Sequence, residues 1–224
     1  MIHTTRKLTR EDCRKIEAAV AKAEEKTSAE IVPAIASSSG RYDRAEDLIG
    51  LLLGILFMTI IYFFLDFRTE SFQWESSNPI FYYFLMVCGL VGGYTFGIFL
   101  GSRIGGLGLL FTPKREMEAE VTAKSKQLFF DGRVHHTKEH VGVLIYISLY
   151  ERMVSIRADE AALKALGQNA IDQLCKEMIL CLKKSSITDA FCETIASAGE
   201  KLGKVLPKTV DDVNETENTL IIVN

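Results

Sequence analysis

The chain has 224 residues and a formal net charge of −3, so it lacks the basic excess of a nucleic-acid-binding protein and no such partner is expected. Its five cysteines form no C-x-x-C pair, which argues against a disulfide framework or a zinc site. We predict reduced, mostly buried thiols in a reducing compartment. The first 26 residues contain no apolar stretch of the signal-peptide kind.

The N-terminal segment predicts a helix followed by a strand. Thr9 can cap the helix while Asp12 returns the bond, and apolar residues then recur at helical spacing. Residues 29–36 are rich in isoleucine and valine and predict the strand. Because Pro33 has no N–H, this strand should lie at a sheet edge or contain a bulge.

Two uncharged stretches, residues 48–65 and 80–102, flank a short polar loop. The first has 18 residues and would span roughly 27 Å as a helix, which is just enough to cross the core of a bilayer. Aromatic residues crowd both sides of the loop, as they do at a membrane interface. We therefore predict a transmembrane hairpin in membrane lipid, with spans near residues 48–66 and 80–102.

Lysine and arginine residues near the ends of the spans predict the orientation. One, Arg68, lies in the loop, and five lie on the outer flanks, namely Arg41, Arg44, Arg103, Lys114 and Arg115. By the positive-inside rule, both termini and the soluble part are expected in the cytoplasm. The chain is thus predicted to be a two-pass protein of the cell (inner) membrane.

Behind the hairpin, residues 116–130 predict a helix and residues 141–150 a strand that is apolar on both faces, so it should be central in its sheet. Glu151-Arg152 forms a tight reversal into an antiparallel strand at 153–158. Helices broken at Gly167 follow at 161–184. A last helix begins at Thr188, with an apolar stripe of Phe191, Ile195, Ala198, Leu202 and Val205. Residues 220–223 either add a strand or remain loose.

These elements predict an α+β fold, a small mixed sheet flanked by helices and interrupted by the hairpin. The helix and strand before the hairpin are too few residues to fold alone, so they should combine with the segment behind it. Packed antiparallel helices keep their ends about 8–10 Å apart, which makes such an insertion feasible. The predicted parts are residues 1–44 and 107–207 for the split domain, 45–106 for the hairpin and 208–224 for a tail.

The soluble segments resemble the TPM domain family, which includes YgcG-like bacterial membrane proteins and thylakoid proteins linked to photosystem II repair. The similar residues are 27–33, 141–149 with Glu151-Arg152, 156–159 and, in the tail, 211–215. The resemblance implies a small sheet flanked by helices, and the tail is similar to that of the subgroup with an inserted membrane hairpin. Relatives are described as acid phosphatases, calcium binders, or assembly and repair factors, and the resemblance implies a LemA-type membrane protein as a partner.

Two sets of residues are candidates for metal binding. His136 and His140 flank Glu139 in an H-x-x-E-H pattern, which binds zinc when it lies within a helix, whereas here a strand follows directly and favours a solvated loop. Glu30 and Asp159 lie at strand boundaries and could hold a divalent cation with backbone carbonyls. The alternative is that Glu30 faces solvent and Asp159 caps the following helix. No other cofactor is expected.

Glycines recur every fourth residue in the second span, and the first span has a shorter matching pair. Such a ladder lets another helix approach closely in lipid. Either the two spans pack against each other, or part of the ladder packs against a second copy or a partner. Neither uncharged stretch contains an Asp, Glu, Lys, Arg or His residue, which argues against a pore. The residues concerned are Gly50, Gly54, Gly89, Gly93, Gly97 and Gly101.

Two functions follow from these features. The first is a membrane-anchored, non-catalytic scaffold, assembly or regulatory module that binds a membrane-protein partner and could form homo-oligomers. The alternative is a metal-dependent, phosphatase-like hydrolase that uses a carboxylate cation site. The sequence leaves open whether the protein is an enzyme.

Overall fold

The computed structural model describes residues 8–71, 79–104, 108–109, 111–131, 141–208 and 218–223. The chain divides into two compact units. One unit combines Met1–Gly40 with Met117–Asn224, and the other is Arg41–Glu116. The second unit is therefore an insertion into the first, and it begins four residues before and ends ten residues after the predicted 45–106.

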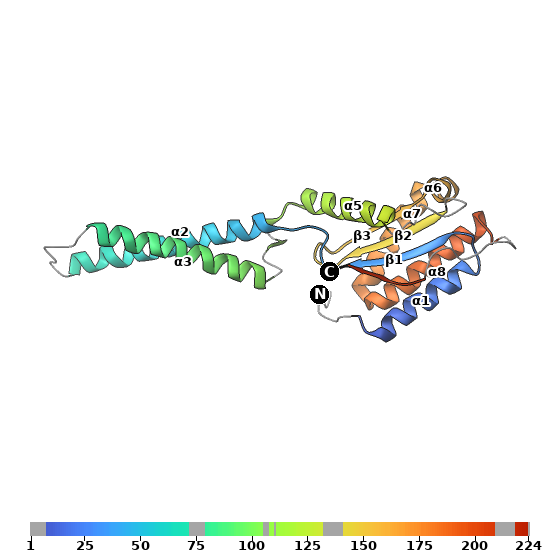
Figure 1. Cartoon of the computed structure of the whole chain (residues 1–224), viewed down its shortest axis with the longest axis horizontal. Helices are drawn as coiled ribbons and strands as arrows, with labels where there is room; N and C mark the ends of the chain where they lie inside the picture. The colour runs from blue at the N-terminus through green and yellow to red at the C-terminus, as the bar shows by residue number, and fades with distance from the viewer. Residues whose placement is uncertain are drawn as a thin grey trace. The chain divides into compact units, whose positions relative to one another are not determined.

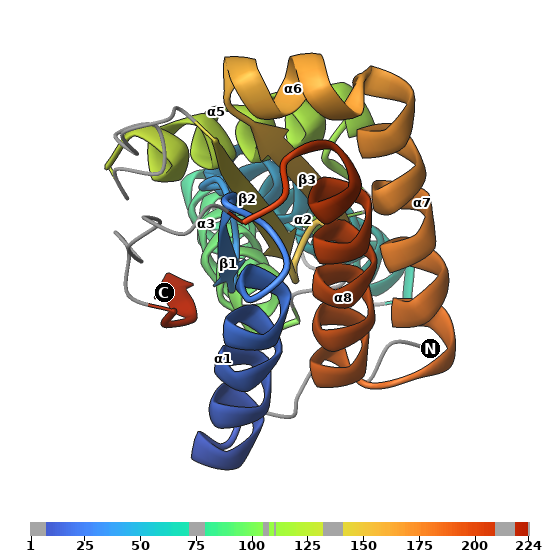
Figure 2. The same ribbon diagram turned by 90° about the vertical axis from the view of Figure 1, so that its right-hand side faces the viewer.

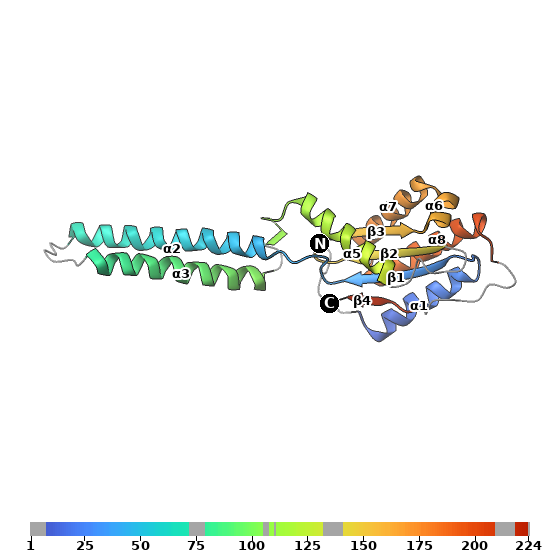
Figure 3. The ribbon, with the colours of Figure 1, turned by 45° about the horizontal axis from the view of Figure 1, so that its top comes forward.

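The first unit contains a four-stranded sheet in the order β3-β2-β1-β4 (Figure 3). β1 (Glu30–Ala36) pairs in parallel with β2 (Gly142–Ser148) and with β4 (Ile221–Val223), and β2 pairs antiparallel with β3 (Met153–Ala158). The predicted α+β fold is confirmed. β2 is central, as its two apolar faces predict, but it ends two residues before the predicted end because Leu149 and Tyr150 already form the turn.

β1, which contains Pro33, is interior along its second half and an edge strand along its first half. The predicted edge position is therefore correct only for the first half. β4 pairs with just the last three residues of β1, which leaves the first half of the strand uncovered on that side. The N–H of Ile31 points to this uncovered side, where it donates to Glu24 Oε1 at 3.0 Å. Backbone groups alternate between the two sides of a strand, so the missing N–H of Pro33 also faces the uncovered side and costs the sheet no hydrogen bond.

Four helices cover one face of the sheet. α8 (Ile187–Val205) lies between α1 (Arg10–Glu24) and α7 (Gln168–Lys184), and α6 (Glu160–Leu166) leads into α7 (Figure 2). The predicted stripe on α8 is buried except for Val205, which is 45% exposed because the helix ends there. This layer contains the larger core, which includes Ile16, Val20, Ile31, Ile145, Leu174, Met178, Phe191 and Ile195.

Capping boxes fix the starts of two of these helices. The Thr9 N–H donates to Asp12 Oδ2 at 2.9 Å and the Asp12 N–H donates to Thr9 Oγ1 at 3.2 Å, as the sequence predicts. Ser186 and Asp189 form the same arrangement at the start of α8. Each pair provides acceptors for backbone N–H groups that have no partner within the first turn of a helix.

A single helix, α5 (Lys114–Asp131), covers the opposite face of the sheet. Its Val121 and Phe129 pack on Leu144 and Tyr146 of β2 in a second, smaller core. A polar contact joins α5 to the edge strand β3, where Arg157 Nε donates to Ser125 Oγ at 2.8 Å. Burial lowers the pKa of this guanidinium.

The second unit consists mainly of two antiparallel helices, α2 (Asp43–Ser71) and α3 (Pro79–Arg103), packed side by side (Figure 1). Within them, Arg44–Leu65 and Ile80–Arg103 are long and apolar enough to cross a membrane. Large apolar side chains point outward along both helices, among them Ile60 at 55% exposed and Phe99 at 57%. A water-soluble helical pair would bury such side chains.

Candidate functional site

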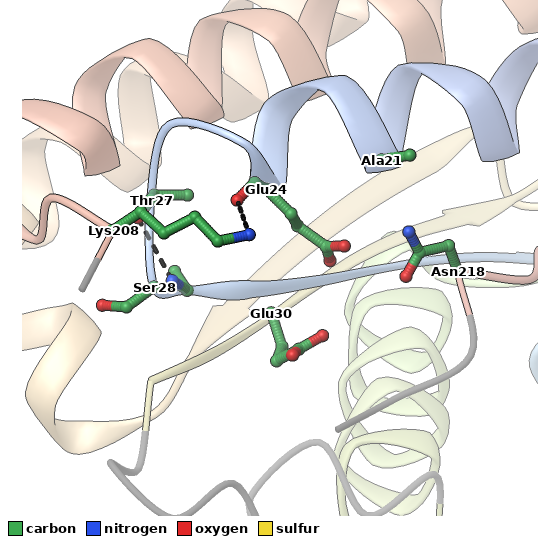
Figure 4. A pocket seen from close by; sticks show the side chains of 8 residues that line it. Ala21, Glu24, Thr27, Ser28, Glu30, Lys208 and Asn218 are labelled. Atoms are coloured by element: carbon green, nitrogen blue, oxygen red, sulfur yellow. Dashed lines mark hydrogen bonds between the residues drawn. The ribbon is translucent and has the colours of Figure 1, made fainter. Parts of the chain in front are cut away.

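A hollow of about 150 Å³ lies beside the uncovered half of β1. Two parts of the chain that are distant in sequence supply its polar side chains (Figure 4). Glu24 comes from the end of α1, Glu30 from the start of β1, and Asn218 and Lys208 from the C-terminal segment. Two carboxyl groups therefore meet at one end of the sheet.

Glu24 is only 8% exposed, and its two oxygens differ. Oε1 accepts the Ile31 N–H, which caps the uncovered edge of β1. Oε2 is buried and has no hydrogen-bond partner among the described residues. Burial raises the pKa of Glu24 to about 7, the charge of Glu30 raises it further, and the Ile31 N–H and the Asn218 side chain act in the opposite direction.

The remaining polar groups of the hollow are held in place. The Thr27 hydroxyl donates to the Leu206 carbonyl at 2.8 Å and accepts the Ala29 N–H at 3.1 Å. Lys208 Nζ donates to the backbone carbonyl of Glu24 at 3.1 Å. Two carboxylates and an amide oxygen are ligands that hard divalent cations prefer, so the chemistry of the hollow fits Ca²⁺ or Mg²⁺.

Glu30 and Asp159 do not form the predicted pair. Glu30 is 7% exposed, so the alternative that it faces solvent is wrong. It lies opposite Gly142, while Asp159 follows the end of β3 two strands away, at a spacing of roughly 10 Å. Asp159 Oδ1 accepts the Glu160 N–H at 2.7 Å and caps α6, as the alternative predicts.

The histidine pattern cannot be placed, because His136 and His140 lie outside the described residues. In the part of the chain that the structure describes, no group of three or more His, Cys, Asp or Glu side chains converges on one point. Glu177 on α7 is bound by Lys201 Nζ at 3.2 Å and by the Ser197 hydroxyl at 3.1 Å. Although burial raises the pKa of Glu177, these two hydrogen bonds lower it overall.

The ladder glycines on α3 face α2. A Cβ at Gly97 would lie 2.6 Å from the Cα of Gly50, and one at Gly93 would lie 2.9 Å from the Cα of Gly54. The ends of the ladder, Gly89 and Gly101, also face α2 side chains rather than open space. In the structure, therefore, the two helices fill the ladder themselves, the first of the two alternatives. Gly92, in contrast, has nothing within 4 Å of such a Cβ.

A further buried carboxylate is Glu151, which is 5% exposed and for which the sequence predicts only a place in a tight reversal. Its Oε1 accepts the Ser39 N–H at 2.7 Å, and its Oε2 accepts the Ser148 hydroxyl. Ser39 Oγ in turn lies 2.8 Å from the hydroxyl of Tyr146, whose pKa burial raises. Glu151 thus fixes the segment of the first unit that precedes the inserted hairpin.

The roles of Glu24 and Glu151 could be recognised only from the topology of the fold. Glu24 ends a helix and could be recognised only once its distance to β1 was known. Glu151 meets Ser39 because β1 and β2 are parallel, so that Ala36 and Ser148 end at the same edge. The cysteines are free, as predicted, but four are half-buried and Cys88 is exposed, so burial was overestimated.

Comparison with protein-family models gives no match, and comparison with curated proteins gives none either. Among solved structures, the chain is similar to the NMR structure of the BA42 protein from the psychrophilic bacterium Bizionia argentinensis. The two share 17% sequence identity over 99% of each chain, with a TM-score of 0.57. At this level of identity the similarity extends to the fold alone.

Proposed function

We propose that the protein is a membrane-anchored, non-catalytic module. The hairpin crosses the bilayer twice, both termini and the α+β unit lie in the cytoplasm, and the α+β unit binds a membrane-protein partner. The observation that best supports this function is the distribution of side chains between the inner and outer faces of the hairpin. Glycines face inward between α2 and α3, and large apolar side chains point outward, which is the arrangement expected of a helical hairpin in lipid.

The bonding of three carboxyl groups outside the hollow supports a non-catalytic role. Asp159 caps a helix, Glu151 accepts a backbone amide and a serine hydroxyl, and Glu177 is bound by a lysine. A general acid or base needs a free oxygen within reach of substrate, whereas both oxygens of Glu151 and of Glu177 accept hydrogen bonds within the fold. The resemblance to the TPM domain family agrees with this role, and we propose membership of that family and a LemA-type partner on that basis.

A buried oxygen without a hydrogen-bond partner favours a second candidate function, the binding of a divalent cation. Glu24 Oε2 is buried and unpaired, and the Glu30 carboxyl lies in the same hollow. A cation there would compensate both carboxylates and remove the penalty that raises the pKa of Glu24. Phosphate hydrolysis needs a positive side chain that can bind the substrate phosphate as well, and Lys208 in the hollow already donates to the backbone carbonyl of Glu24. The geometry thus favours cation binding over a phosphatase-like reaction.

One experiment separates these functions. The full chain is purified in a mild detergent, and the same sample is examined for co-purifying proteins and for bound metal. A stoichiometric membrane-protein partner, without phosphatase turnover, is the expected result. The opposite result is metal-dependent turnover without any co-purifying partner, with the turnover lost in Glu24→Gln and Glu30→Gln. That result would refute the non-catalytic function in favour of the hydrolase.

A further inference from the structure

A second hollow, of about 210 Å³, lies entirely within the Arg41–Glu116 unit. On one side it is lined by the start of α2, with Tyr42, Arg44 and Leu48. On the other side it is lined by the segment entering α5, with Phe111 and Glu116. Arg44 is also the first residue of a candidate span, so in a bilayer the hollow would lie at the water-facing end of α2.

The hollow contains two opposite charges that do not pair. Arg44 and Glu116 both line it, yet no ion pair or hydrogen bond joins their side chains in the described part of the chain. A lone phosphate would be attracted by Arg44 and repelled by Glu116. A ligand that has an anionic and a cationic group on one short chain satisfies both side chains at once.

The apolar side chains of the hollow indicate that the ligand also has an apolar part. Leu48 lies one helical turn beyond Arg44 and is 42% exposed, and Phe111 across the hollow is 38% exposed. These side chains provide a surface for acyl chains beside the charged end. A volume of about 210 Å³ is below the size of a typical drug-like pocket and suits a small headgroup.

We propose that this hollow binds the headgroup of a zwitterionic phospholipid, with its phosphate at Arg44 and its ammonium at Glu116. The inference rests on the proposed membrane anchorage and adds a lipid preference to it. Phosphatidylethanolamine fits both charges, because its primary ammonium can donate to the Glu116 carboxylate. An anionic lipid such as phosphatidylglycerol fits only the arginine.

The test measures the thermal stabilisation of the full chain in detergent by added short-chain lipids that differ only in headgroup. Phosphatidylethanolamine should stabilise at lower concentration than phosphatidylglycerol with the same acyl chains. Arg44→Gln and Glu116→Gln should each weaken the ethanolamine response about tenfold, the loss expected for one charged hydrogen bond. Arg41→Gln and Glu118→Gln are matched controls, because both side chains are exposed and lie outside the hollow.

Three results would overturn the proposal: equal responses to the two lipids, an unchanged ethanolamine response in both variants, or an equal response to free phosphoethanolamine. The last would identify a soluble phosphate compound as the ligand. Extraction of the same proteins with alkaline carbonate distinguishes this failure from that of the proposed function. Retention in the membrane without a headgroup preference refutes only the lipid site, whereas release of the unmodified protein refutes the anchorage.

Discussion

Glu24→Gln should stabilise the protein in alkaline solution and have little effect in acid. The substitution removes the charge but keeps an oxygen that can accept the Ile31 N–H. The pKa of Glu24 is raised from 4.5 to about 7 in the folded state. The stability provided by the neutral carboxyl is therefore fully present below pH 4.5 and is lost as the pH rises through about 7.

The size of the effect follows from the same shift. A rise from 4.5 to about 7 corresponds to about 3 kcal/mol between the two protonation states. The hollow is open to water, which screens the charges, so we expect about 1–2 kcal/mol. For a chain of this length, that stabilisation raises the Tm by about 2–8 °C.

The assay is thermal unfolding of the full chain in detergent, followed by the circular dichroism of its helices, a signal that needs no thiol chemistry. Measurements at about pH 8 and pH 5, with a chelator present, should show the gain only at the higher pH. Glu25→Gln is the matched control, since the Glu25 side chain is adjacent but exposed. Equal Tm changes at the two pH values would refute the assignment of the raised pKa to Glu24.

Three further substitutions test the packing and the buried network. Gly93→Leu should destabilise the hairpin by about 1–3 kcal/mol because its side chain meets α2 backbone, while Gly92→Leu should be tolerated, as limited proteolysis in detergent will show. Glu151→Ala should cost about 2–4 kcal/mol, read as a lower Tm, because it leaves the Ser39 N–H without its acceptor. Ser186→Ala should cost about 1 kcal/mol by loss of the α8 cap, and an unchanged denaturation midpoint would contradict that role.

The order of elements could be predicted from the sequence because each depends on local patterns. The capping box at Thr9 and the apolar character of both faces of β2 agree with the structure. The position of Pro33 could not be derived, because it depends on β4 covering only half of β1. That pairing joins residues nearly 190 positions apart, and no local signal in the sequence encodes it.

The candidate site could be predicted only in part, for a related reason. Glu30 was identified from its place at a strand boundary, but its partner was expected to be Asp159. The structure places Glu24 beside it instead, because the turn after α1 brings the end of that helix against the start of β1. Which carboxyl groups meet is a property of the tertiary packing, as it is for Glu151 and Ser39.

The central claim, a hairpin that crosses the membrane and leaves the α+β unit in the cytoplasm, is tested most directly by cysteine labelling in intact cells. In a chain without its native cysteines, single cysteines are introduced as Ser77→Cys in the loop between the spans and Ser185→Cys, an exposed position after α7. A membrane-impermeant maleimide should label the first in intact cells and the second only after lysis. Labelling of the Ser185→Cys protein in intact cells, or no difference between the two, would contradict the account.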